Sequence, residues 1–261
     1  MKLTNSLEKI IKPVSVVFNE EKHTYTHIAT GEMYTGCTTI SDAWDKSFFL
    51  GPWYAKEMMD ELLKQPFEAI TENPKTFELA LTAAKGAAKR KSEKAKLVGK
   101  LAHEYFGNLI SGKNPESPED EEAKRSAESF KRYFDTLGAQ WIASEEIVAS
   151  DEYKVAGTLD ALAVIDGITY IVDFKTSNQL SASYILQCAG YDIMLREMGM
   201  VVSGYLVIRT PKDGGDVETL TITDKETMGF ARDTFLKQRE AHKFYVFAEN
   251  KLKENGKIKT D

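Results

Sequence analysis

The chain has 261 residues, of which 42% are hydrophobic and 28% are charged, and its formal net charge at pH 7 is −6. Such a composition predicts a soluble globular protein with one large domain or two small ones. The negative balance argues against a generally basic nucleic-acid coat, but it does not exclude a local basic path.

The lack of targeting signals and the small number of cysteines indicate the compartment in which the protein is expected. No apolar run has the length of a membrane span, and the N-terminus lacks the pattern of a signal peptide. The two cysteines, Cys37 and Cys188, are too few for a disulfide scaffold or a four-cysteine cluster. We therefore expect an intracellular, cytoplasmic protein that does not contact a membrane.

The chain begins with short strands. Two are expected over residues 14–18 and 23–27, and a third follows the Thr30-Gly31 turn. Hydroxyl side chains at Thr38, Thr39 and Ser41 then offer caps for a helix. This pattern predicts a small β-structure ahead of the first helices.

Helices are expected next, over residues 52–63 and 74–88. Aromatic residues are frequent here, and they are interpreted as the core of an N-terminal helical subdomain, with stacking on nucleic-acid bases as the alternative. They are Trp44, Phe48, Phe49, Trp53 and Tyr54.

A basic run follows and leads into a helix over residues 92–110. The run is interpreted either as a solvated face or as a phosphate contact, and the sequence leaves both open. Its cations, opposed by Glu93, are Lys85, Lys89, Arg90, Lys91, Lys94, Lys96 and Lys100. The helix places Gly99 and His103 on one face, four residues apart.

After a loop, a helix is expected over residues 119–137, and Gly138 ends it. A strand over residues 141–149 carries Glu145 and Glu146. These elements lead directly into the most informative stretch of the chain.

That stretch is a predicted β-hairpin. The pair Asp166-Gly167, flanked by apolar and β-branched residues, is typical of a two-residue turn between strands over residues 154–165 and 168–175. Counting outward from the turn places Ile165 opposite Ile168.

The same register places Asp160 opposite Asp173, with Lys175 on the same face as Asp173. Two opposed carboxylates repel each other unless a cation lies between them. A lysine relieves part of this repulsion and a divalent cation relieves more. The alternative is a surface hairpin with ordinary charges.

The remaining elements complete an α/β pattern. A helix over residues 182–198 holds Gln187 and Tyr191 on one face, and strands follow over residues 201–209 and 217–223. Thr223 or Asp224 caps a long C-terminal helix. The apolar positions of that helix are Phe230, Phe235, Phe244, Tyr245 and Phe247.

Taken together, the spaced motifs resemble the PD-(D/E)xK nucleases, in particular the RecB-like exonuclease branch. The matching residues are Gly99-xxx-His103, Gly157-xx-Asp160, Asp173-Phe-Lys175 and Gln187-xxx-Tyr191. Thr38-Thr39-Ile40 followed by tryptophans is similar to phage and mitochondrial-maintenance exonucleases of this branch. The resemblance implies an α/β fold with a central mixed β-sheet flanked by helices. The restriction-endonuclease-like αβββαβ core would occupy residues 92–261, after an N-terminal strand and helical extension over residues 1–91 that forms a nucleic-acid path.

The resemblance also implies a role for each site residue. His103, Asp160 and Asp173 would hold a metal ion together with the carbonyl of Phe174. Lys175 would hold or activate the attacking water and stabilise charge on the phosphate. Glu145 would join the catalytic group, and it fits the spacing better than Glu146. The substrate contacts would come from Gln187, Tyr191, Lys100 and Thr176.

Mg²⁺ or Mn²⁺ is the implied cofactor, and the resemblance implies DNA, single-stranded or with free ends, as the partner. Some relatives carry an iron–sulfur cluster on four cysteines, which the two cysteines here cannot form. A protein partner in replication, recombination or repair fits such a nuclease, in the host cytoplasm if the chain is phage-encoded. A neighbouring metal ion is expected to lower the pKa of Lys175.

Three functions follow, in order of preference. The first is a metal-dependent exonuclease acting on single-stranded DNA or DNA ends. The second is an endonuclease, of resolvase or restriction type, on the same core. The third is a catalytically silent nucleic-acid-binding subunit, although neither a ligand nor the lysine is lost from the motifs.

Overall fold

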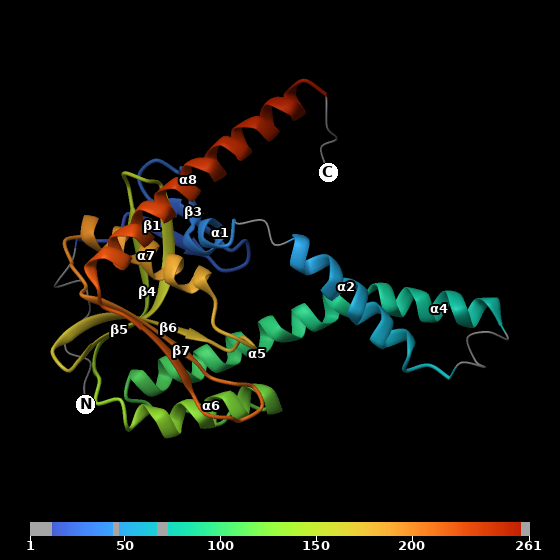
Figure 1. Cartoon of the computed structure of the whole chain (residues 1–261). Helices are drawn as coiled ribbons and strands as arrows, with labels where there is room; N and C mark the ends of the chain where they lie inside the picture. Colours follow the sequence, from blue (N-terminus) through green and yellow to red (C-terminus); the bar gives the residue numbers. More distant parts are fainter. Residues whose placement is uncertain (1–11, 44–46, 67–72, 257–261) are drawn as a thin grey trace. The chain divides into compact units, whose positions relative to one another are not determined.

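The computed structural model describes residues 12–43, 47–66 and 73–256. It is a mixed α/β fold in which helices flank an eight-stranded mixed sheet (Figure 1). Its elements are β1 (Val16–Asn19), β2 (Thr24–His27), β3 (Met33–Gly36), α1 (Cys37–Ser41), α2 (Ser47–Leu62), α4 (Pro74–Lys85), α5 (Ala87–Ile110), α6 (Glu121–Phe134), β4 (Gln140–Ser150), β5 (Val155–Ile165), β6 (Ile168–Lys175), α7 (Ala182–Glu197), β7 (Gly204–Arg209), β8 (Glu218–Ile222) and α8 (Lys225–Glu254). The predicted order of helix, extra helix, three strands, helix and strand is confirmed in α5 to β7.

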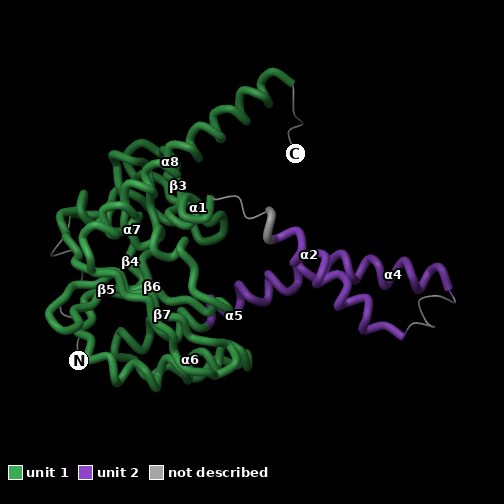
Figure 2. The backbone as a smooth tube through the Cα atoms, viewed as in Figure 1, with its two compact units in different colours: residues 1–43, 102–261 green, residues 44–101 purple. Residues whose placement is uncertain are grey.

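The chain divides into two compact units (Figure 2). The larger unit holds residues 1–43 and 102–261, and the smaller one holds residues 44–101. The N-terminal strands belong to the larger unit, because β3 pairs with β5 in the main sheet. The functional boundary expected between residues 91 and 92 stays a prediction.

The sheet forks along one edge of β5, and this fork positions the site. β4 pairs with β5 along nearly its whole length and so occupies one edge of β5. On the other edge, β3 pairs with Val155 and Ala156, whereas β6 pairs from Ala161 to Ile165. Residues 157–160 therefore lie between the ends of two different neighbouring strands.

The predicted turn and the start of the hairpin register are confirmed, since Ile165 pairs with Ile168. The predicted pair of Asp160 with Asp173 is the next position in this register, but the ladder ends one step earlier, at Ala161 and Val172, so the two residues are not paired in it. The carboxylate of Asp160 instead accepts a hydrogen bond from the backbone N–H of Phe174, at 2.7 Å from Oδ2. The Asp160 side chain thus takes the place of a backbone acceptor beyond the last pair of the ladder.

The two faces of the sheet pack against different helices (Figure 1). One face packs with α1, α7 and α8, through residues such as Leu159, Ile171 and Tyr205. The other packs with α5 and α6, through Ala161 and Phe174 among others. Leu159 and Ala161 are two residues apart yet lie on opposite faces, so the alternation of β5 shifts at Asp160.

Two predicted helix starts have different outcomes. Asp224 caps α8 as expected, because its side chain accepts a hydrogen bond from the N–H of Thr227. The hydroxyls of Thr38 and Thr39 lie inside α1 rather than capping it, since the N-cap is Gly36 and no side chain bonds there.

The aromatic positions of α8 are mostly not part of the core. Phe235 is buried against α7, whereas the four other aromatics predicted as apolar positions are exposed: Phe230, Phe244, Tyr245 and Phe247. In the smaller unit Trp53 is half-buried and Tyr54 is exposed, while Trp44 and the side chains of Phe48 and Phe49 lie outside the described part. None of the described helices combines the length and the apolar character needed to span a bilayer.

Candidate active site

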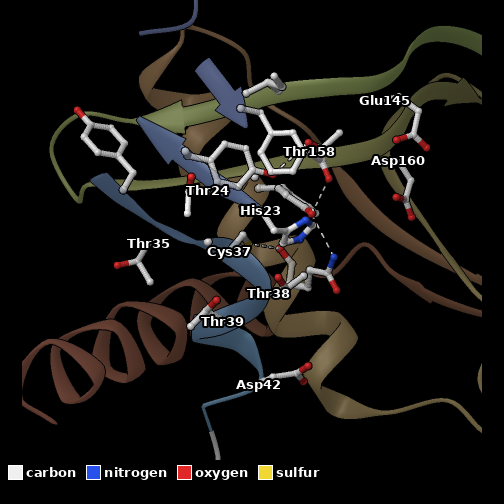
Figure 3. Close-up of a pocket in the computed structure, with 18 of the residues that line it drawn as sticks. His23, Thr24, Thr35, Cys37, Thr38, Thr39, Asp42, Glu145, Thr158 and Asp160 are labelled. Atoms are coloured by element: carbon white, nitrogen blue, oxygen red, sulfur yellow. Dashed lines mark hydrogen bonds between the residues drawn. The ribbon is translucent and has the colours of Figure 1, made fainter. Parts of the chain in front are cut away.

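A large cavity opens at the fork of the sheet, within the larger unit. Its volume is about 910 Å³, near the upper end of the roughly 300–1,000 Å³ typical of ligand sites. Figure 3 shows Glu145 and Asp160 side by side, with Thr38, Thr39 and Asp42 along another wall. The polar residues that line it from α5, the main strands β4 to β6 and α7 are His103, Glu145, Thr158, Asp160, Lys175, Tyr184, Gln187 and Tyr191.

Three of these residues form a compact group of donor atoms. One ligand atom each from His103, Glu145 and Asp160 lies within 4.8 Å of the other two. The Nδ1 atom of His103 is 3.3 Å from Oδ1 of Asp160. The group joins α5, β4 and β5, which pack together around the fork.

Glu145 reaches this group through an unusual backbone conformation. Its φ angle is +55°, a left-handed value that is uncommon for a residue other than glycine. Its neighbours Ser144 and Glu146 pair with Ala161 and Leu159, so the position of Glu145 on β4 faces Asp160 across an unpaired step. Strained backbone of this kind is concentrated at functional sites.

Asp173 and Lys175 form an ion pair at the edge of the cavity. Both carboxylate oxygens of Asp173 are 2.7 Å from Nζ of Lys175, and Oδ1 accepts its hydrogen bond. The Asp173 side chain is 1% exposed, whereas that of Lys175 is 17% exposed and lines the cavity. Nζ of Lys175 also lies 5.0 Å from the centre of the Tyr184 ring, close enough for a cation–π contact.

The His103 and Asp160 pair favours its charged forms. Burial alone would lower the pKa of His103, but the charge and hydrogen bond of Asp160 outweigh burial and raise it. Burial would raise the pKa of Asp160, yet the charges of His103 and Lys175 lower it. Asp160 is therefore a carboxylate, with negative charge facing the cavity.

Lys175 remains charged in the protein alone. Burial would lower its pKa, but the charges of Asp173 and Asp160 outweigh that effect and raise it. A neighbouring metal ion is expected to lower the pKa of Lys175, and the protein's own carboxylates oppose that effect. Burial raises the pKa of Asp173 to about 6, although Lys175 acts in the opposite direction.

The donor set fits a hard divalent cation. Carboxylate oxygens are ligands that Mg²⁺ and Mn²⁺ prefer, and here two carboxylates and an imidazole meet at one wall of an open cavity. Oδ2 of the buried Asp173 lies outside this group and accepts no hydrogen bond, but it is 2.7 Å from the charged Nζ of Lys175.

The remaining predicted residues take different positions. The side chain of Gln187 donates a hydrogen bond to Tyr191 Oη, and Tyr191 donates one to the carbonyl of Thr158; both side chains line the cavity. The side chain of Phe174 is buried on the face of the sheet that packs against α5 and α6. Thr176 is also buried, and it does not line the cavity. Lys100 belongs to the smaller unit. The roles expected of these residues stay predictions.

Sequence reasoning missed Tyr184, and of the N-terminal wall of the cavity it singled out only the Thr38-Thr39-Ile40 motif. Tyr184 precedes Gln187 by three residues and Tyr191 by seven, so helical spacing alone would place it on their face. The N-terminal wall, formed by β1, β2 and α1, depends on the long-range pairing of β3 with β5. No local pattern in the sequence signals that pairing.

Glu145 is expected to titrate near neutral pH in protein freed of metal with EDTA. Burial and the charge of Asp160 raise its pKa from an ordinary 4.5 to about 7, against a smaller opposing effect of His103. The folded protein then binds this proton more tightly than the unfolded chain, so the contribution of Glu145 to stability falls as pH rises from about 4.5 to about 7.

Carboxyl NMR titration would measure this directly. The Glu145 signal is expected to move with a midpoint near 7, and Asp160→Asn is expected to lower that midpoint by removing a neighbouring negative charge. A midpoint at the ordinary value, or one that Asp160→Asn leaves unchanged, would contradict this description of the site.

Comparisons with known proteins give the following. No protein-family model matches the chain, and no curated protein sequence matches it. The alkaline exonuclease LHK-Exo from Laribacter hongkongensis is 10% identical, with a TM-score of 0.35, over 83% of this chain and 93% of its own. LHK-Exo in complex with dAMP is 12% identical over the same shares, with a TM-score of 0.33. The protein SSO0001 is 12% identical over 72% of this chain and 86% of its own, with a TM-score of 0.30.

Proposed function

We propose that this protein is a metal-dependent nuclease that hydrolyses phosphodiester bonds in DNA, and that it acts as an exonuclease on single strands or free ends. One observation carries the proposal: the donor group of His103, Glu145 and Asp160 shares an open cavity with the charged end of Lys175. Hydrolysis of a phosphodiester needs a cation at the phosphoryl oxygen together with a second positive group that stabilises the growing charge.

The bound group would be Mg²⁺ or Mn²⁺, held by His103, Glu145 and Asp160. Such an ion supplies a Lewis acid for the phosphoryl oxygen and favours deprotonation of water. In the reaction a water oxygen forms the new bond to phosphorus, the bond to the leaving sugar oxygen breaks, and that oxygen takes up a proton.

The protein's own side chains supply binding and charge. Lys175 donates hydrogen bonds to a non-bridging phosphate oxygen, and Asp173 holds its Nζ from below at 2.7 Å. The Asp160 carboxylate is fixed by the N–H of Phe174, so its free oxygen faces His103. Gln187 and Tyr191 orient the wall of the cavity through their bonds to each other and to Thr158.

The preference for single strands or ends is supported by the basic run and the aromatic residues of the N-terminal region. The test is an assay with purified protein on end-labelled linear single-stranded DNA and on a circular single strand, in Mg²⁺ or Mn²⁺ and in EDTA. Loss of the linear strand alone, only with metal, is the expected result. Cutting of the circle would replace the exonuclease with an endonuclease, and no cutting of either would overturn the nuclease proposal.

A further inference from the structure

The N-terminal wall of the cavity carries a short stack of aromatic rings. The rings of His23 and Phe18 lie 5.1 Å apart and edge to face, and those of Phe18 and Tyr25 lie 4.7 Å apart with an angle of 32° between them. All three residues line the cavity. Phe18 is half-buried and His23 is exposed, so this wall, which we call the aromatic wall, presents ring surface to the space.

The aromatic wall is tied to the strand that carries the donor group. The hydroxyl of Tyr25 lies 3.1 Å from Oγ1 of Thr158, two residues before Asp160. His23 adopts a left-handed φ of +52° at the end of the turn between β1 and β2, and its ring packs against Phe18. These contacts hold the aromatic wall at a fixed place relative to Asp160.

Charge limits what this wall can bind. Among the described residues that line the cavity, Lys175 is the one lysine or arginine, and it lies with the donor group. The N-terminal side instead contributes Glu20 and Asp42, together with threonine hydroxyls. Acidic side chains disfavour a second phosphate there, whereas aromatic rings and hydroxyls suit the uncharged base and sugar of a nucleotide.

We propose that the aromatic wall of Phe18, His23 and Tyr25 is a stacking site for one base of a single-stranded DNA substrate, beside the phosphate that Lys175 contacts. This proposal rests on the proposed nuclease function of the same cavity. It explains why one cavity joins a metal-binding group at one end to an aromatic surface without cations at the other.

The test compares variants and substrates in one cycle. Fluorescently labelled single-stranded oligonucleotides, each with one abasic position at successive distances from an end, are bound to the full chain in EDTA so that no strand is cut. For the wild type, one position is expected at which removing the base weakens binding about tenfold. In the double variant His23→Ala, Phe18→Leu that penalty is expected to disappear, because base and rings would no longer stack.

A matched control uses two exposed residues, one in β1 and one directly after β2. Val17 and Ile28 are 56% and 67% exposed and do not line the cavity, so Val17→Ala, Ile28→Ala is expected to keep the penalty. His23→Ala alone, at an exposed position, is expected to reduce the penalty in part even if the double variant folds poorly. A merely structural role would weaken intact and abasic strands equally.

The outcomes separate this proposal from the proposed function. A penalty that persists in both His23 variants, or no penalty at any position, would overturn the stacking site even if the wild type cuts DNA. If the protein does not cut DNA but shows an abasic penalty that the His23 variants reduce, the nuclease proposal is contradicted and the stacking site is supported.

Discussion

Asp160→Asn is expected to abolish Mn²⁺ binding to the protein without DNA and to lower DNA cleavage at least about thousandfold. A catalytic cation contributes several kcal/mol to the stabilisation of the transition state, and each 1.36 kcal/mol changes a rate tenfold. Asp160 provides the central carboxylate of the donor group, 3.3 Å from His103. Asparagine has the same shape and still offers an oxygen to the N–H of Phe174, so the fork is expected to keep its structure.

Calorimetric titration with Mn²⁺, followed by a cleavage assay on single-stranded DNA, would measure both effects. Asp166→Asn is the matched control, because Asp166 is an exposed turn residue of the same hairpin with a φ of +49°, a conformation that asparagine accepts. It is expected to leave metal binding and cleavage unchanged. Wild-type Mn²⁺ affinity in Asp160→Asn would show that the donor group is not the metal site.

Asp192→Ala is expected to lower the free energy of unfolding by about 3 kcal/mol. Asp192 is completely buried and accepts hydrogen bonds from Arg196 on its own helix, from Arg232 on α8 and from Tyr205 on β7, at 2.8, 2.6 and 2.8 Å. Removing the carboxylate leaves two guanidinium groups and a hydroxyl without their partner. Arg196 and Arg232 are 38% and 24% exposed, so water rehydrates them in part and keeps the loss at the lower end of the range for buried pairs.

Urea denaturation, monitored by circular dichroism, would measure this loss of stability. The control is Glu254→Ala, which removes an exposed ion pair with Lys251 near the end of α8. Exposed pairs of this kind contribute little, so the control is expected to match the wild type within error. Equal midpoints for Asp192→Ala and the wild type would mean that the buried network does not hold α7, α8 and β7 together.

Local signals in the sequence predicted the elements around the site. The turn at Asp166-Gly167 and the pairing of Ile165 with Ile168 follow from turn chemistry, and the structure has both. The helical spacing of Gln187 and Tyr191 likewise places them in hydrogen-bond contact. These predictions succeed because each depends on residues close together in the chain.

The errors arise where distant segments meet. The hairpin ladder ends one residue before Asp160, since β5 there leaves β6 and continues toward its pairing with β3. The left-handed backbone of Glu145 has no local sequence signature. Phe244 and Tyr245 are exposed although apolar, because their segment of α8 extends beyond the helices and strands that bury Phe235 (Figure 1).

The most direct test of the central claim is single-turnover cleavage of end-labelled single-stranded DNA in Mn²⁺ by the wild type and by Lys175→Ala, with DNA binding measured on the same samples. The account predicts metal-dependent cleavage by the wild type and a rate at least about hundredfold lower for Lys175→Ala at undiminished occupancy, since loss of one preorganised donor has that effect. Equal rates for the two proteins, or no cleavage by the wild type, would contradict it.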